Sequence, residues 1–110
     1  MSSSTVEARW PAVTRVDVSD DTLTVELSDG RTLSVPLAWY PRLVYATPQE
    51  RSHWRLIGGG HGIHWPDLDE DISVENLLGG KPSGESGKSL QRWLEGRSRL
   101  GGRPRTDDVA

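Results

Sequence analysis

Alternating apolar and polar residues on both sides of Asp29-Gly30 constrain the fold of this 110-residue chain more than any other feature. The alternation covers residues 22–28 before the dipeptide and residues 33–35 after it. Asp-Gly favours a type I′ hairpin turn, which needs positive φ at both central residues. An earlier alternating run, residues 14–18, ends at the polar turn Asp20-Asp21. The sequence therefore predicts an antiparallel three-stranded meander with one apolar and one polar face.

Such a meander must cover its apolar face, and the residues that follow predict short helices that do so. Residues 36–46 are rich in aromatic residues, and Pro41 suits the first turn of a helix, where its missing N–H is no loss. The core candidates in this segment are Leu37, Trp39, Leu43 and Val44. Thr47 predicts an N-cap with Glu50 at N3, so we expect a second short helix from Pro48 to about His53.

The rest of the first 80 residues predicts two more short strands and one more helix. Residues 54–57 and 62–65 have strand patterns and are separated by three glycines. Residues 73–78 predict a short helix that ends at Gly79-Gly80. The expected fold class is therefore α+β: a small antiparallel β-meander with short helices packed on one face.

Charge and apolar content divide the chain at about residue 80. Residues 1–80 hold 31 of the 37 apolar residues and carry a net charge of −6, whereas residues 81–110 carry +3 and are rich in Gly, Ser and Arg. A segment so poor in apolar residues buries too little surface to offset its ordering entropy. We expect a folded domain over residues 10–80 and a flexible tail over residues 81–110. The tail is expected to be mostly disordered, with at most a marginal helix over residues 86–95.

Composition excludes several classes of protein. Without cysteine there are no disulfides, thiolate metal sites or cysteine nucleophiles. No apolar run approaches the roughly 20 residues of a membrane helix, and the N-terminus lacks the apolar centre of a signal peptide. We therefore expect a cytoplasmic protein without membrane contact, and no residue pattern indicates a cofactor.

His61 and His64, followed by three aspartates within residues 67–71, resemble a set of metal ligands. Residues three apart in an extended segment point to opposite faces, so the imidazoles converge only where the neighbouring glycines bend the chain. The aspartates imitate the start of a calcium loop but place Ile72 where glycine is required and Leu78 where glutamate is required. The sequence predicts neither a metal site nor catalytic residues, and a metal-dependent enzyme is the least favoured alternative.

Two groups of residues are candidates for contact with other macromolecules. The candidate protein-binding residues are Trp39, Tyr40, Trp93 and Leu94. Tryptophan outside a core is often an interface anchor, so Trp93 either contacts a partner or docks on its own domain. The candidate nucleic-acid-binding residues are Arg97, Arg99, Arg103 and Arg105. No aromatic residue lies among these arginines to stack on bases, which favours a solvated basic tail over a nucleic-acid site.

Two stretches of the chain together resemble one protein family. The first comprises residues 13–18 and 23–31, which form the predicted meander. The second covers residues 63–78 and contains Trp65, Pro66, Asp67, Asp69, Leu77 and Leu78. In this pattern a Trp-Pro pair precedes an acidic turn and a helix that ends in leucines. Over about residues 12–80 the chain resembles the DUF2442 family, a small bacterial domain of unknown function.

The resemblance implies an α+β fold of a small antiparallel sheet with short helices. It also implies a role, because many members are encoded beside another small protein in an arrangement like a toxin–antitoxin pair. We therefore expect a non-enzymatic interaction module, antitoxin-like, that binds and masks a small partner protein. The acidic domain predicts that this partner is basic. Nucleic acid bound through the tail, or a second copy of the chain, are the alternative partners.

Overall fold

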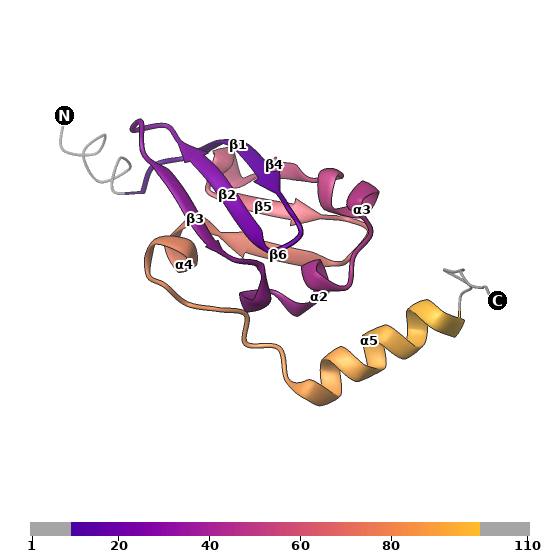
Figure 1. The fold of residues 1–110 in the computed structure, drawn as a ribbon. Coiled ribbons are helices and arrows are strands. Elements are labelled where there is room, and N and C mark those ends of the chain that lie inside the picture. The colour runs from indigo at the N-terminus through magenta and orange to yellow at the C-terminus, as the bar shows by residue number, and fades with distance from the viewer. Residues whose placement is uncertain (1–9, 100–110) are drawn as a thin grey trace.

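The computed structural model describes residues 10–99, which form two three-stranded antiparallel sheets and several short helices. The first sheet consists of β1 (Val13–Val18), β2 (Thr22–Leu27) and β3 (Thr32–Pro36), in that order. The second consists of β4 (Arg55–Ile57), β5 (Gly62–Trp65) and β6 (Glu70–Ser73), also in chain order. Figure 1 shows the first sheet lying over the second. The α+β class expected from the sequence is confirmed.

The helices are short and connect or flank the sheets. They are η1 (Leu37–Trp39), α2 (Pro41–Val44), α3 (Pro48–Ser52), η2 (Gly58–Gly60), α4 (Val74–Leu78) and α5 (Gly87–Arg99). The predicted cap of α3 is confirmed: the Glu50 amide donates to the Thr47 hydroxyl, and the Glu50 carboxylate accepts from the Thr47 amide. Ser73 caps α4 in the same way, through the Asn76 amide. Of the helices in residues 10–99, none is both long and apolar enough to pass through a membrane.

The first sheet is the predicted meander, with one difference at its hairpin. Strand β2 buries Leu23, Val25 and Leu27, as the alternation indicates. At the following turn Gly30 has a φ of 94°, whereas Asp29 is not in the positive-φ region. The turn is therefore not the type I′ turn expected from the sequence. The Leu27 amide donates to the Arg31 carbonyl, so the loop is longer than the two residues that a type I′ turn connects.

The second sheet contains a strand that the sequence did not predict. Strands β4 and β5 match the two expected segments, but β6 occupies the segment expected to be only an acidic turn. Its four residues contain one apolar side chain, Ile72, so no alternation marks it. Asp69, at φ 52°, turns the chain so that Glu70 pairs with Trp65. Much of the cover of the meander is therefore this second sheet rather than helices alone.

A single core cluster joins the two sheets. Its buried members are Val13, Val16, Leu23, Val25, Leu27, Val35, Leu37, Tyr40, Leu43, Ala46, Ile63, Trp65, Leu68, Ile72, Val74 and Leu77. Trp65 is completely buried, and its indole N–H donates to the Arg51 carbonyl at 3.0 Å. Of the core residues expected near α2, Leu37 and Leu43 are buried and Trp39 is half-buried. Val44 is exposed, because a helix of a single turn presents one side to the core and Val44 lies on the other.

The segment expected to be a flexible tail contains α5, which extends beyond the marginal helix predicted over residues 86–95. Figure 1 shows this helix beside the two sheets and joined to α4 by a connection without regular structure. The connection is tied to the domain, because the Ser83 amide donates to the Trp39 carbonyl at 2.9 Å. The last part of the expected tail, residues 100–110, lies outside the described residues.

Candidate interaction surface

Strand β4 lies at the edge of the second sheet and exposes two large apolar side chains. Leu56 is 36% exposed and Ile57 is 38% exposed. In the described part of the chain β4 pairs with β5 alone, so one row of its backbone N–H and C=O groups faces away from the sheet. Natural proteins usually protect such edges, because an uncovered apolar edge strand pairs readily with another chain.

The register explains why both residues are exposed. Leu56 pairs with Ile63 and shares its inner face, but at the margin of the sheet. Ile57 pairs with Gly62 and lies on the outer face. A Cβ atom at Gly62 would come within 3.0 Å of the Ile57 side chain, so glycine leaves room for it. Consecutive apolar residues in a short strand put one side chain on each face, and this signal was available in the sequence.

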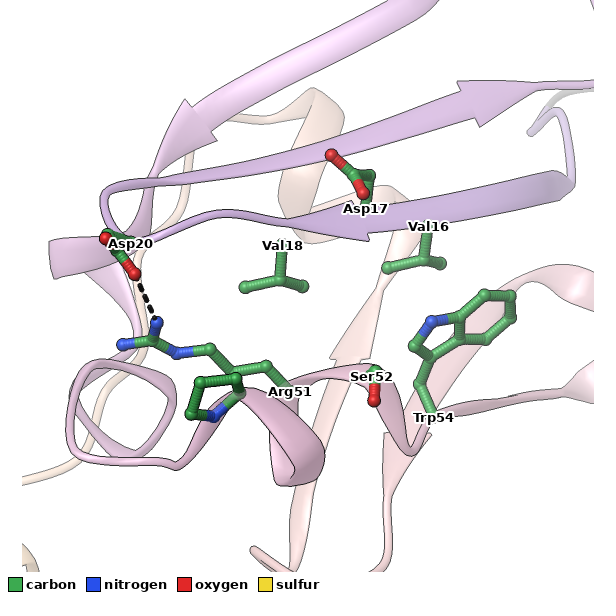
Figure 2. A pocket seen from close by; sticks show the side chains of 8 residues that line it. Val16, Asp17, Val18, Asp20, Arg51, Ser52 and Trp54 are labelled. Atoms are coloured by element: carbon green, nitrogen blue, oxygen red, sulfur yellow. Dashed lines mark hydrogen bonds and ion pairs between the residues drawn. The ribbon is translucent and has the colours of Figure 1, made fainter.

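A small hollow lies near β4, between β1 and α3. It has a volume of about 140 Å³ and is lined by Val16, Asp17, Val18, Asp20, Pro48, Arg51, Ser52 and Trp54. Figure 2 shows Val16 and Val18 pointing from β1 toward α3, with the Trp54 ring facing them from the segment that leads into β4. Pockets for small-molecule ligands usually measure about 300–1,000 Å³. The hollow is therefore the size of a side chain rather than of a cofactor.

Arg51 forms the polar end of this hollow. Its side chain is buried, and its guanidinium donates to the carbonyls of Leu43 and Val44, both at 2.9 Å. The same guanidinium contacts the fully exposed carboxylate of Asp20 at 3.2 Å (Figure 2). Two carbonyls and one carboxylate thus satisfy the buried charge. Only Oδ1 of Asp20 takes part, which leaves the other carboxylate oxygen toward solvent.

The two sheets also touch at the other end of β1 from the hollow. A Cβ atom at Gly60, in η2, would come within 2.9 Å of the Ala12 side chain and 3.2 Å of the Val13 carbonyl. The next residue, His61, is hydrogen-bonded through its ring Nε2 to the Trp10 carbonyl at 2.8 Å. These contacts hold the start of β1 against the β4–β5 connection. Figure 1 shows β1 and β4 near each other accordingly.

The aromatic surface predicted around Trp39 and Tyr40 is not present as expected. Tyr40 is 3% exposed, so its side chain does not contribute to the surface of the domain. Its side chain packs into the core, and its hydroxyl has no hydrogen-bond partner among the described residues. Burial, and then the charge of Glu70, raise the pKa of Tyr40 to about 12. Trp39 is half-buried and packs against the same core.

Trp93 docks on its own domain, one of the two alternatives left open by the sequence. It packs against the core, with the guanidinium of Arg42 at 5.1 Å from its ring centre and that of Arg97 at 4.7 Å. Arg42 also binds the Glu85 carboxylate through two nitrogens, at 2.9 and 2.7 Å. Helix α5 is thus held by a tryptophan between two arginines. Leu94 lies one residue further on and is half-buried.

Of the four arginines considered as alternative contacts for nucleic acid, Arg97 is the one whose side chain the structure describes. Arg97 donates to both carboxylate oxygens of Glu50, at 3.1 and 2.9 Å. Its charge is therefore already paired within the domain. The side chain of Arg99, together with Arg103 and Arg105, lies outside the described residues.

The two histidines considered as metal ligands bind separate groups. Both ring nitrogens of His61 face carbonyl oxygens, those of Gly58 and Trp10. The His64 ring instead contacts the Asp71 carboxylate on the neighbouring strand. Across residues 10–99, no three His, Asp or Glu side chains come together as a metal site requires.

The family-like residues within 63–78 pack in the core or shape the turn between β5 and β6. Trp65 and Leu77 are buried in the core, and Leu78 packs against it. Pro66 and Asp67 are exposed in the turn after β5, where the Asp67 carboxylate binds His53 at 2.7 Å. Asp69 has the positive φ that lets the chain return as β6. The pattern thus encodes the β5–β6 turn and the α4 packing.

These features define a small α+β domain of two stacked antiparallel sheets, with an apolar edge strand beside a hollow the size of a side chain. The profile of the DUF2442 family, described as a protein of unknown function, matches residues 13–83, so the chain belongs to this family. The resemblance seen in the sequence is therefore confirmed. None of the curated proteins matches the chain.

Two solved structures share the fold. The crystal structure of a protein of unknown function from Rhodospirillum rubrum is 27% identical, with a TM-score of 0.59, and the match covers 68% of this chain and 93% of that one. The solution structure of an uncharacterized protein from Chromobacterium violaceum is 20% identical, with a TM-score of 0.62, and the match covers 81% and 82%. The second likeness concerns the fold alone.

Proposed function

We propose that the protein is a non-enzymatic interaction module that binds and masks a small basic partner protein, in the manner of an antitoxin. The observation that carries this proposal is the uncovered edge of β4 with its exposed Leu56 and Ile57. An edge strand of this kind offers backbone hydrogen bonds to an added strand and apolar contacts on both of its faces.

Charge supports the choice of a basic partner. Residues 1–80, which include both sheets, carry a net charge of −6. An acidic domain attracts a basic protein over long range and repels other acidic proteins, so it favours this class of partner. The gene arrangement implied by the family resemblance indicates where to look for this partner: a neighbouring gene that encodes a small basic protein.

The test is co-expression of the chain with that neighbouring protein, followed by size-exclusion chromatography. We expect the two proteins to elute together from wild-type material. Ile57→Lys places a charge at the centre of the apolar edge and repels a basic partner, so it should weaken the complex about tenfold or more. Titration calorimetry of the separated proteins measures this change.

Val44→Lys is the matched control. Val44 is 39% exposed, nearly the same as Ile57, but it lies on α2 rather than at a sheet edge. This variant should bind the partner as tightly as the wild type. Separate elution of the wild-type proteins contradicts the proposed function, and equal weakening by both substitutions contradicts its location at β4.

A further inference from the structure

The hollow between β1 and α3 combines apolar walls with a carboxylate rim, a combination that suits one kind of side chain. Val16, Val18 and Pro48 provide aliphatic surface, and the Trp54 ring forms a wall (Figure 2). Asp20 lies at the rim with a carboxylate oxygen that makes no hydrogen bond to the described residues. A long apolar stem with a cationic end satisfies both parts of this surface.

We propose that this hollow binds one arginine side chain of an extended segment of the basic partner, an inference that rests on the proposed function. The arginine stem lies on Val16 and Val18 and against the Trp54 ring, and its guanidinium reaches the free oxygen of Asp20 at the far end of the hollow. Arginine is favoured over lysine because its guanidinium is more weakly hydrated than an ammonium group and presents several N–H donors to a carboxylate.

The surroundings of the hollow support an extended segment as the occupant. The hollow is bounded by β1, an edge strand of the first sheet, and by Trp54, the residue directly before the edge strand β4. A segment that pairs as an extra strand with either of these edges presents alternate side chains to the domain. One of these side chains reaches the hollow. Asp17 alternates with Val16 and Val18 along β1, so its carboxylate lies on the other side of the strand (Figure 2), where it adds to the negative charge around β1.

Arg51 does not prevent this use of the hollow. Its charge is neutralised by Asp20, and two of its nitrogens are occupied by the carbonyls of Leu43 and Val44. These bonds fix the guanidinium at one end of the hollow. The Trp54 ring lies at the other end of the hollow, where the arginine stem packs against it (Figure 2).

A defined peptide tests the hollow without the partner. The probe is an acetylated and amidated seven-residue peptide of alternating threonine and valine with one central arginine, titrated into the full chain labelled with ¹⁵N. We expect the largest shifts at the Trp54 indole and at the amides of β1 and α3. The same peptide with neutral citrulline in place of arginine should bind at least about fivefold more weakly.

Two variants locate the binding. Trp54→Leu removes the aromatic wall, and its matched control is Trp39→Leu, which alters another half-buried tryptophan away from the hollow. Asp20→Asn removes the charge of a fully exposed side chain that also pairs with Arg51, but Arg51 keeps its bonds to the carbonyls of Leu43 and Val44, so we expect the variant to fold. Each of Trp54→Leu and Asp20→Asn should weaken the arginine peptide by about threefold or more, whereas Trp39→Leu should leave its affinity unchanged.

Equal affinity for the arginine and citrulline peptides overturns the inference, as does the absence of shifts at the hollow. The same variants applied to the partner complex separate this inference from the proposed function. If the wild type and Asp20→Asn bind the partner equally, the proposed function stands, but the inference that the hollow binds an arginine side chain is wrong. If the wild type does not bind the neighbouring protein, the proposed function fails, while the peptide titration still decides what the hollow binds.

Discussion

At the scale of single residues, Glu70 is a carboxyl group whose charged form is destabilised by the fold. Burial is the main cause, and it raises the pKa of Glu70 to about 7 from an ordinary value of 4.5. Arg42 lowers this pKa, whereas the carboxylates of Glu85, Asp71 and Asp69 raise it. The folded chain therefore holds a proton on Glu70 that the unfolded chain releases between pH 4.5 and about 7.

The sign of the resulting pH dependence follows from this difference in protonation. Because the folded state binds more protons in this range, the free energy of unfolding should fall as pH rises from about 5 to about 8. Glu70→Gln removes the titration and should make the protein more stable at about pH 8, by about 1 kcal/mol after allowance for solvent screening. The wild type and Glu70→Gln should differ little in free energy of unfolding at about pH 5. Thermal unfolding at both values measures the effect, and an unchanged pH slope in Glu70→Gln contradicts it.

Two other carboxylates act in the opposite direction. The hydrogen bond from Arg42 lowers the pKa of Glu85, and for Glu50 the bonds from Arg97 and the Thr47 backbone outweigh the effect of burial and lower its pKa. Both contribute stability that is present above their unfolded pKa and is lost as pH falls. The free energy of unfolding should consequently be greatest at mildly acidic pH, where Glu50 and Glu85 are charged and Glu70 is still protonated.

At the scale of elements, the sequence predicted features that depend on neighbouring residues, and it did not predict features that depend on distant ones. The cap at Thr47 and the helix after Ser73 depend on residues within four positions of each other, so the sequence predicted both. Strand β6 depends on the turn at Asp69 and on pairing with β5, and its own residues carry little pattern. The docking of α5 depends on Arg42 and Glu85, which are 43 positions apart.

The candidate surface was missed for a related reason. The sequence predicted an interaction surface of exposed aromatic residues, but Tyr40 is buried in the fold. Ile57 is exposed because β4 is an edge strand, and strand order is a property of the whole sheet. The hollow joins β1 to residues 48–54, which approach each other only when the sheets stack. The apolar pair Leu56-Ile57 is visible in the sequence, but its place at a sheet edge and the position of the hollow cannot be read from a local run of residues.

The docking of α5 by charged side chains gives a prediction at this scale. Arg97→Glu replaces the pair with Glu50 by a repulsion and removes one of the two guanidiniums from the Trp93 ring. Partly exposed ion pairs and cation–π contacts each contribute about 0.5–1 kcal/mol, so the docked state should lose about 1–2 kcal/mol. Hydrogen exchange should show faster exchange in α5 and unchanged protection in the two sheets.

Arg92→Glu is the matched control, because Arg92 lies exposed on the same helix and makes no ion pair within residues 10–99. It changes the charge of α5 by the same amount without touching the docking contacts. Slow exchange in α5 of Arg97→Glu, or equally fast exchange in both variants, would show that the Glu50 pair does not hold the helix.

At the scale of the whole molecule, one close approach joins the β4–β5 connection to the start of β1. Gly60 lies in η2 with a φ of 92°, and a Cβ atom added to it would meet Ala12. Strand β1 also lines the hollow, so the proposed arginine site requires that β1 keep its position relative to the second sheet. A side chain at residue 60 would push β1 away from the β4–β5 connection.

Gly60→Ala should therefore destabilise the fold more than the neighbouring change Gly59→Ala. Both glycines have positive φ, which costs an alanine about 1–2 kcal/mol, but a Cβ atom at Gly59 meets nothing within 4 Å. The Cβ at Gly60 additionally comes within 2.9 Å of Ala12, so we expect a further loss of about 1–3 kcal/mol. Urea unfolding of the two variants measures this difference. Because Gly60→Ala also shifts β1, it should weaken the arginine peptide while Gly59→Ala does not; equal stability and equal binding would mean that the hollow does not depend on this junction.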